Sequence, residues 1–192
     1  QLLAWQTRGD PDLAGKRWML KCPFHLPVLS ELHAEFPGSL IVWTHRNPVD
    51  CIGSACSLYE TLMHAVVDSW TLDRKALGPA ILKLTRLSLD KALAGIMAQK
   101  SLQGRMVHLR YMDTVNQTID SIQKVCQAAG LSFTPAYKMQ IENYMAKSNA
   151  ARAAAKMGKG RGMLHSYKLE DYGLSKPVVE QAFRDYIKQF RL

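Results

Sequence analysis

Short apolar runs of strand type alternate along this chain with longer stretches that have helical periodicity. The strand-type runs are residues 17–21, 40–44 and 106–110. Helical spacing of apolar residues follows each run, and Asn47-Pro48 supplies a helix-start signal after the second one. This alternation predicts an α/β fold with a parallel sheet and helices on both faces. Three strands are few for such a sheet, so we expect it to be incomplete on its N-terminal side.

The later helices are predicted from the residues at their boundaries. We expect two helices between residues 68 and 100, separated at Gly78-Pro79. Gly130 closes the helix that follows the third strand, and Thr134-Pro135 opens the next one. One last helix is expected over residues 176–190. These elements predict a single domain over residues 1–192, with a loop or a helix end over residues 1–16.

The composition excludes several classes of protein. Of the 192 residues, 47% are hydrophobic and 21% are charged, which excludes disorder of the whole chain. No apolar stretch reaches the roughly 18 residues of a membrane-spanning helix, so we expect no span in this segment. The four cysteines have neither zinc-ligand spacing nor the pattern of a disulfide framework, so we expect no metal site and free thiols.

The net charge of +9 is concentrated in one stretch of the chain. Between Asn143 and Leu169 there is no acidic residue. The basic residues of that stretch are Lys147, Arg152, Lys156, Lys159, Arg161 and Lys168. We expect an anionic partner there, and nucleic acid, anionic lipid and a phosphorylated small molecule all satisfy the charge. Few aromatic residues interleave with these cations and no nucleic-acid motif is present, so nucleic acid is not expected.

A cationic residue stands at the end of every predicted strand. The first strand ends at Lys21, the second at His45-Arg46 and the third at Arg110-Tyr111. Parallel strands end at one edge of a sheet, so we expect these side chains to meet beside the helix that begins at Asn47-Pro48. The unpaired N–H groups of a helix N-terminus also favour an anion, and Ser54 lies two turns along the same helix face. The sequence thus predicts a site for a phosphorylated ligand.

The strand-end motifs and the C-terminal region together resemble one enzyme family. The motifs are Trp18-Met19-Leu20-Lys21-Cys22-Pro23-Phe24-His25-Leu26, Phe36-Pro37, Thr44-His45-Arg46-Asn47-Pro48 with Ser54, Leu109-Arg110-Tyr111-Met112-Asp113, and His165-Ser166-Tyr167-Lys168-Leu169-Glu170-Asp171-Tyr172-Gly173-Leu174. In this order and spacing, from about residue 17 to the C-terminus, the chain resembles the sulfotransferases that use 3′-phosphoadenosine 5′-phosphosulfate (PAPS). The resemblance implies their fold, which is similar to that of P-loop NTPases. It also implies transfer of a sulfuryl group from PAPS to an acceptor hydroxyl or amine, without a metal.

The resemblance assigns roles to individual residues. Arg46 and Ser54 resemble the pair that binds the 3′-phosphate of PAPS. Lys21 resembles the lysine that contacts the transferring sulfuryl group and the bridging oxygen, where a cation stabilises the charge that develops on the leaving phosphate. Tyr111 resembles the tyrosine near the adenine, and an ordinary core tyrosine at a strand end is the alternative.

Further assignments come from the basic segment and from two histidines. Lys159 and Arg161 stand where many sulfotransferases have a basic, glycine-containing loop over the 3′-phosphate, although a solvated basic loop is an equal alternative. His165 is assigned to the cofactor site, with a role as catalytic base or a purely structural role as its alternatives. His25 is the candidate base, because a histidine of near-neutral pKa can accept a proton from the acceptor. A structural role in its helix is an equal alternative for His25.

One expected family motif has no counterpart in the sequence. Sulfotransferases begin with a strand and a loop rich in glycine, serine and threonine that cradles the 5′-phosphosulfate, and nothing in residues 1–17 resembles it. We therefore expect the C-terminal part of a sulfotransferase, inactive by itself. A non-catalytic nucleotide- or polyanion-binding module is the alternative, while a P-loop kinase lacks its GxxxxGK[ST] motif. The acceptor is expected to be a small molecule, a glycan or a peptide, and cytoplasm and Golgi lumen both fit the sequence.

Overall fold

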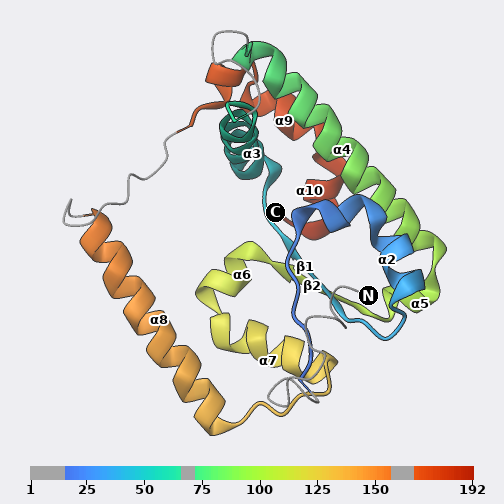
Figure 1. The fold of residues 1–192 in the computed structure, drawn as a ribbon, viewed down its shortest axis with the longest axis vertical. Helices are drawn as coiled ribbons and strands as arrows, with labels where there is room; N and C mark the ends of the chain where they lie inside the picture. The colour runs from blue at the N-terminus through green and yellow to red at the C-terminus, as the bar shows by residue number, and fades with distance from the viewer. Residues whose placement is uncertain (1–15, 66–71, 157–166) are drawn as a thin grey trace.

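The computed structural model describes residues 16–65, 72–156 and 167–192, and its described part is organised around two parallel strands (Figure 1). Strand β1 (Ile41–His45) pairs with β2 (Met106–Arg110). The register runs from Ile41 opposite Met106 to His45 opposite Arg110, so both strands end at the same edge. The predicted second and third strands are confirmed, as is their parallel direction.

Helices lie on both faces of this sheet. On one face, Trp43 and His45 of β1 and His108 of β2 pack against aromatic rings of α10 (Arg184–Phe190). On the other face, Val107 and Leu109 are buried where α6 (Tyr111–Asn116) and α7 (Thr118–Ala128) pack against β2. Figure 1 shows the strands crossing the molecule between these two groups of helices. The predicted α/β architecture is therefore confirmed.

The main hydrophobic core lies between α3 (Pro48–Met63), α4 (Arg74–Ala98), the 3₁₀ helix η4 (Leu169–Tyr172) and α9 (Lys176–Ala182). Its most deeply buried side chains include Ile52, Cys56 and Val179. A smaller cluster, Leu29, Ala92, Ile96 and Leu102, joins α4 to α2 (Leu29–Glu35) and α5 (Lys100–Gln103). The 3₁₀ helix η2 (Pro23–Val28) packs against α4, and α8 (Pro135–Lys156) runs along one side in Figure 1.

Local capping residues explain where several helices begin and end. The Asn47 side chain accepts a hydrogen bond from the Val49 amide at 3.0 Å, and Pro48 takes the first helical position of α3. Asp73 caps α4 in the same way, by accepting from the Lys75 amide at 2.8 Å. Gly130 adopts a φ of 63° just after α7, which only a residue without a Cβ adopts freely. The predicted starts at Asn47-Pro48 and Thr134-Pro135 and the stop at Gly130 are confirmed.

The prediction of a strand over residues 17–21 is wrong. This segment is irregular, and its apolar side chains face solvent, with Met19 93% exposed. An apolar run becomes a strand only where a neighbouring strand offers its backbone hydrogen bonds, and within the described residues β1 and β2 pair only with each other. The segment is instead attached through the Arg17 guanidinium, which donates to the Ala129 carbonyl after α7.

Two helix boundaries also differ from the predictions. Helix α4 continues through Pro79, and the preceding Gly78 has no Cβ to collide with the proline ring. The expected single helix over residues 176–190 is divided into α9 and α10 at Phe183. At this break the Arg86 guanidinium donates a hydrogen bond of 3.0 Å to the Ala182 carbonyl. Arg86 thus satisfies a carbonyl that the helix leaves unbonded at this break.

None of the helices in the described ranges is both long enough and apolar enough to cross a membrane.

Candidate functional site

The shared edge of the sheet brings Arg46 and Tyr111 together. Arg46 follows β1 directly and Tyr111 follows β2, and these strands end side by side because His45 pairs with Arg110. The Arg46 guanidinium carbon lies 4.6 Å from the centre of the Tyr111 ring, within the range of a cation–π contact. The sequence-based expectation that these two side chains meet at one edge agrees with this geometry.

The Arg46 guanidinium keeps donors that are open to a ligand. Its side chain is 42% exposed, and its ion pair with Asp50 on α3 is long, at 3.7 Å from Nε to Oδ2. An exposed pair at this distance contributes little, because water screens it. Tyr111 is also partly exposed, so the two side chains form an accessible cationic and aromatic surface.

Two expected contributions to an anion site are reduced in the structure. The first amides of α3 are used inside the cap, since Val49 N–H donates to the Asn47 side chain and Asp50 N–H donates to the Asn47 carbonyl. The Arg110 guanidinium is paired with Asp113, at 2.8 Å and 2.9 Å to the two carboxylate oxygens. These two N–H groups at the start of α3 are therefore already bonded to Asn47. The Asp113 carboxylate likewise balances the charge of Arg110 at the end of β2.

The other predicted site residues that the structure describes lie on α3, in η2 and in the irregular segment before η2. Ser54 is half-buried on α3, two turns after Asn47. Lys21 is exposed in the irregular segment before η2, and His25 is half-buried within η2, which packs on α4. In the described ranges, Arg46 makes no hydrogen bond or ion pair with any of these three. The remaining predicted residues, Lys159, Arg161 and His165, lie outside the described residues.

His45 is not part of the exposed surface at the strand ends, although it directly precedes Arg46. Its side chain is 1% exposed and points into the core. Its imidazole makes hydrogen bonds of 2.8 Å to both His108 and the Tyr186 hydroxyl. Burial, together with the neighbouring His108, lowers the pKa of His45 to about 3, so the ring is neutral at pH 7. The sequence counted His45 among the strand-end residues, and the buried network around it was missed.

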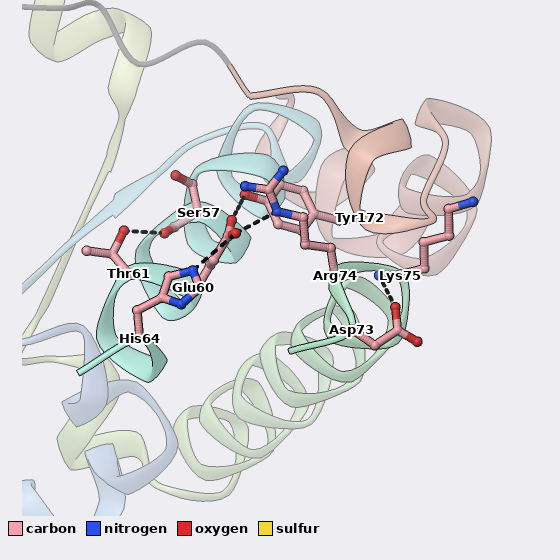
Figure 2. A network of polar contacts seen from close by, with 8 residues as sticks. All are labelled: Ser57, Glu60, Thr61, His64, Asp73, Arg74, Lys75 and Tyr172. Carbon is pink, nitrogen blue, oxygen red and sulfur yellow. Dashed lines mark hydrogen bonds and ion pairs between the residues drawn. The ribbon is translucent and has the colours of Figure 1, made fainter. Parts of the chain in front are cut away.

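A second polar cluster joins α3, α4 and η4 (Figure 2). Glu60, 8% exposed, accepts hydrogen bonds from Arg74 at 2.5 Å and from the Tyr172 hydroxyl at 2.8 Å. His64 lies 3.5 Å from the same carboxylate. Burial by itself raises the pKa of Glu60, but the hydrogen bonds from Arg74, Tyr172 and His64 outweigh it, so the pKa lies below its ordinary value. This cluster was not predicted from the sequence, and the available signal was the position of Glu60 among the apolar residues of a predicted helix.

Close backbone approaches fix the segment that carries Tyr172. A Cβ added at Gly78 of α4 would lie 1.9 Å from the Tyr172 carbonyl oxygen, so only glycine allows α4 and η4 to touch there. Gly53 of α3, the residue before Ser54, makes a similar approach, because a Cβ there would lie 3.1 Å from the Tyr167 ring. Residues 167–173 are therefore packed tightly against α3 and α4.

The described ranges contain no cluster of three or more His, Cys, Asp or Glu side chains arranged to hold a metal ion.

The family model described as the sulfotransferase family matches residues 4–135. The chain belongs to the sulfotransferase family. The match covers the irregular segment, both strands and the strand ends that carry Arg46 and Tyr111. Within this sulfotransferase-family chain, the two motifs expected to share a sheet edge, residues 44–48 and 109–113, do share it.

Two solved structures are similar to the chain. Sulfotransferase STF9 from Mycobacterium avium is 23% identical with a TM-score of 0.72, over 91% of this chain and 42% of that chain. Sulfotransferase STF1 from Mycobacterium tuberculosis H37Rv is 24% identical with a TM-score of 0.65, over 88% of this chain and 40% of that chain. These similarities show the fold, and the chain spans about two fifths of the length of either protein. A comparison with curated proteins gave no match.

Proposed function

We propose that this chain carries the 3′-phosphate half of a PAPS site and serves in sulfuryl transfer to an acceptor hydroxyl or amine. The observation that carries the proposal is the Arg46 guanidinium at the end of β1, partly exposed and weakly paired, over the ring of Tyr111. Arginine binds phosphate through two parallel hydrogen bonds, and such charge-assisted bonds are stronger than neutral ones. Ser54 is the second proposed contact to the 3′-phosphate.

Tyr111 has a restricted role in this proposal. Arg46 covers one face of its ring, so a purine that stacks on Tyr111 uses the other face or displaces the guanidinium. A ligand with both a phosphate and an adenine satisfies both side chains at once. This pairing favours a nucleotide over a simple polyanion.

The proposed reaction is an in-line transfer. The acceptor oxygen or nitrogen forms a bond to sulfur while the bond from sulfur to the bridging oxygen of the 5′-phosphate breaks. The products are the sulfated acceptor and adenosine 3′,5′-bisphosphate, and the acceptor proton passes to a base. We assign Lys21 to the charge that develops on the bridging oxygen and His25 to the base. Lys159, Arg161 and His165 are assigned to the nucleotide.

The chain alone is proposed to bind the nucleotide without sulfating an acceptor. It spans about two fifths of the two sulfotransferases whose fold it shares, and residues 1–17 contain no loop rich in glycine, serine and threonine for the 5′-phosphosulfate. The acceptor is proposed to be a small molecule, a glycan or a peptide. A non-catalytic nucleotide-binding module is the second candidate, which the same Arg46 surface supports.

The test is a calorimetric titration with adenosine 3′,5′-bisphosphate, with ATP as the competing nucleotide. We expect the bisphosphate to bind more tightly than ATP. Arg46→Ala should weaken bisphosphate binding at least about tenfold, because it removes a charge-assisted contact to phosphate.

The matched control is Arg105→Ala. Arg105 is an exposed arginine directly before β2, at the opposite end of the sheet from Arg46. It should leave bisphosphate affinity within about twofold of wild type. Equal affinity of wild type and Arg46→Ala would overturn the assignment, and equal loss in both variants would reduce it to general charge attraction.

A further inference from the structure

Three side chains form a hydrogen-bonded chain behind the strand ends. His45 Nε2 lies 2.8 Å from His108 Nδ1, and His45 Nδ1 lies 2.8 Å from the Tyr186 hydroxyl. The Phe190 ring stacks on His45 with centroids 3.7 Å apart and 13° between planes. Trp43 closes the group, 4.7 Å from His45. We call His45, His108 and Tyr186, with the rings of Trp43 and Phe190, the His45 cluster.

Its members are neutral, so its hydrogen bonds have a direction. Burial lowers the pKa of both histidines and raises the pKa of Tyr186. Each neutral imidazole has one donor and one acceptor nitrogen. Either Tyr186 donates to His45, which donates to His108, or both bonds run in the reverse direction. In both arrangements the two nitrogens of His45 are satisfied inside the core.

The cluster lies directly behind the residues of the proposed anion site. His45 immediately precedes Arg46, and His108 is three residues before Tyr111. His45 and Arg110 form the last registered pair of the sheet, so Arg46 and Tyr111 project just beyond the end of the ladder. The His45–His108 bond is therefore a diagonal side-chain link between the strands, from the last residue of β1 to the residue of β2 that lies opposite Trp43.

We propose that His45, His108 and Tyr186 act as positioning residues that hold Arg46 over Tyr111 for anion binding. This inference rests on the proposed function of Arg46. Within the described residues the sheet has five registered pairs, and Tyr186 ties its end to α10, 141 residues further along the chain. Loss of the Tyr186 hydroxyl leaves a buried His45 nitrogen without a hydrogen-bond partner. The nitrogen finds a new partner only if the end of β1 shifts, and that shift moves Arg46.

The Glu60 cluster offers a matched comparison. Tyr172 also donates a buried hydroxyl hydrogen bond of 2.8 Å, but to Glu60 between α3, α4 and η4, away from the ends of β1 and β2. Tyr172→Phe and Tyr186→Phe therefore remove the same atom from two sites in one core. A general loss of stability affects both variants, whereas a positioning effect appears in one.

The experiment measures bisphosphate affinity by calorimetry and Tm by thermal unfolding for both variants. Tyr186→Phe should weaken adenosine 3′,5′-bisphosphate binding about fivefold, while Tyr172→Phe stays within about twofold of wild type despite an equal or larger loss of Tm. Unchanged affinity in Tyr186→Phe, or equal weakening in both variants, would overturn the positioning role.

A ligand-free measurement separates this inference from the proposed function. The NMR chemical shifts of the Tyr111 ring protons report the guanidinium above the ring. They should change in Tyr186→Phe and not in Tyr172→Phe. If the wild type does not bind the bisphosphate, the proposed function fails, and the Tyr111 shifts alone decide: a change restricted to Tyr186→Phe supports positioning, and its absence refutes it.

Discussion

Within the described residues, the buried polar clusters around His45 and around Glu60 differ in charge, although each contains a buried tyrosine hydroxyl. Glu60 is a carboxylate that accepts from Arg74, Tyr172 and His64 (Figure 2). His45 is a neutral ring among aromatic side chains, with another imidazole and a phenol as partners. The supply of donors decides the difference, because a buried charge persists only where hydrogen bonds or a counter-charge replace water.

The comparison also separates the two clusters by their response to acid. The pKa of His45 is about 3 in the folded chain against an ordinary value of 6.5. The contribution of the neutral His45 to the free energy of unfolding is therefore fully present above about pH 6.5 and is lost as the pH falls toward 3. The pKa of Glu60 is lowered from 4.5, so its contribution is present above about pH 4.5 and is lost below it. As the pH falls, the contribution of His45 is therefore lost before that of Glu60.

The largest expected effect is a substitution that separates the helices around the Glu60 cluster. Gly78→Ala places a Cβ 1.9 Å from the Tyr172 carbonyl oxygen, and a backbone atom cannot move aside as a flexible side chain can. We expect a loss of about 3 kcal/mol or more in the free energy of unfolding, measured by urea denaturation. Gly104→Ala is the control, since its nearest atoms lie at 3.7 Å and its φ is −67°, and it should remain within about 0.5 kcal/mol. Equal stability of the two variants would contradict this account of Gly78.

A smaller effect is expected from mild acid. Moving from pH 7 to pH 5 should lower the free energy of unfolding by about 2 kcal/mol through His45 alone. The reason is that His45 binds a proton over this range in the unfolded chain but not in the folded chain. His108, whose pKa is also lowered, adds in the same direction. Urea denaturation at pH 7, 6 and 5 measures this slope, and His45→Gln should reduce it. A stability that does not change over this range would show that the pKa of His45 is not lowered in the folded chain.

The smallest effect is the difference between the two tyrosine variants at pH 7. Tyr172→Phe removes a hydrogen bond to a charged group and should cost about 1.5 kcal/mol or more, while Tyr186→Phe removes one between neutral groups and should cost about 1 kcal/mol. Chemical denaturation of both variants under one condition gives the comparison. A larger loss for Tyr186→Phe would mean that the neutral cluster supports more of the core than its hydrogen bonds indicate.

Sequence reasoning recovered the parts of the fold that depend on local signals. The Asn47-Pro48 start, the Gly130 stop and the run at residues 106–110 were predicted because a helix cap, a left-handed glycine and a short apolar run are all visible within a few residues. The run at residues 17–21 has similar composition, yet it is irregular because pairing depends on a neighbour and not on the run itself. Gly78-Pro79 was expected to separate two helices, but α4 continues through both residues.

The candidate site shows the same division. Topology alone placed Arg46 beside Tyr111, because parallel strands must end at one edge. The pairing of Arg110 with Asp113 and the burial of His45 were not predicted, since both depend on side-chain directions that residue spacing does not specify. Tyr186 falls within the last predicted helix, but its partner His45 lies 141 positions away, beyond the reach of any local pattern.

That separation has a consequence for the order in which the chain is made. At a synthesis rate of about 5–20 residues per second, roughly 7 to 28 s pass between the appearance of residue 45 and that of residue 186. Throughout that interval Trp43 lacks the helix that later covers it, and the His45 imidazole bonds to water in place of the Tyr186 hydroxyl. On the ribosome, the apolar face of β1 is therefore open to contacts with other nascent segments or with a chaperone until α10 arrives.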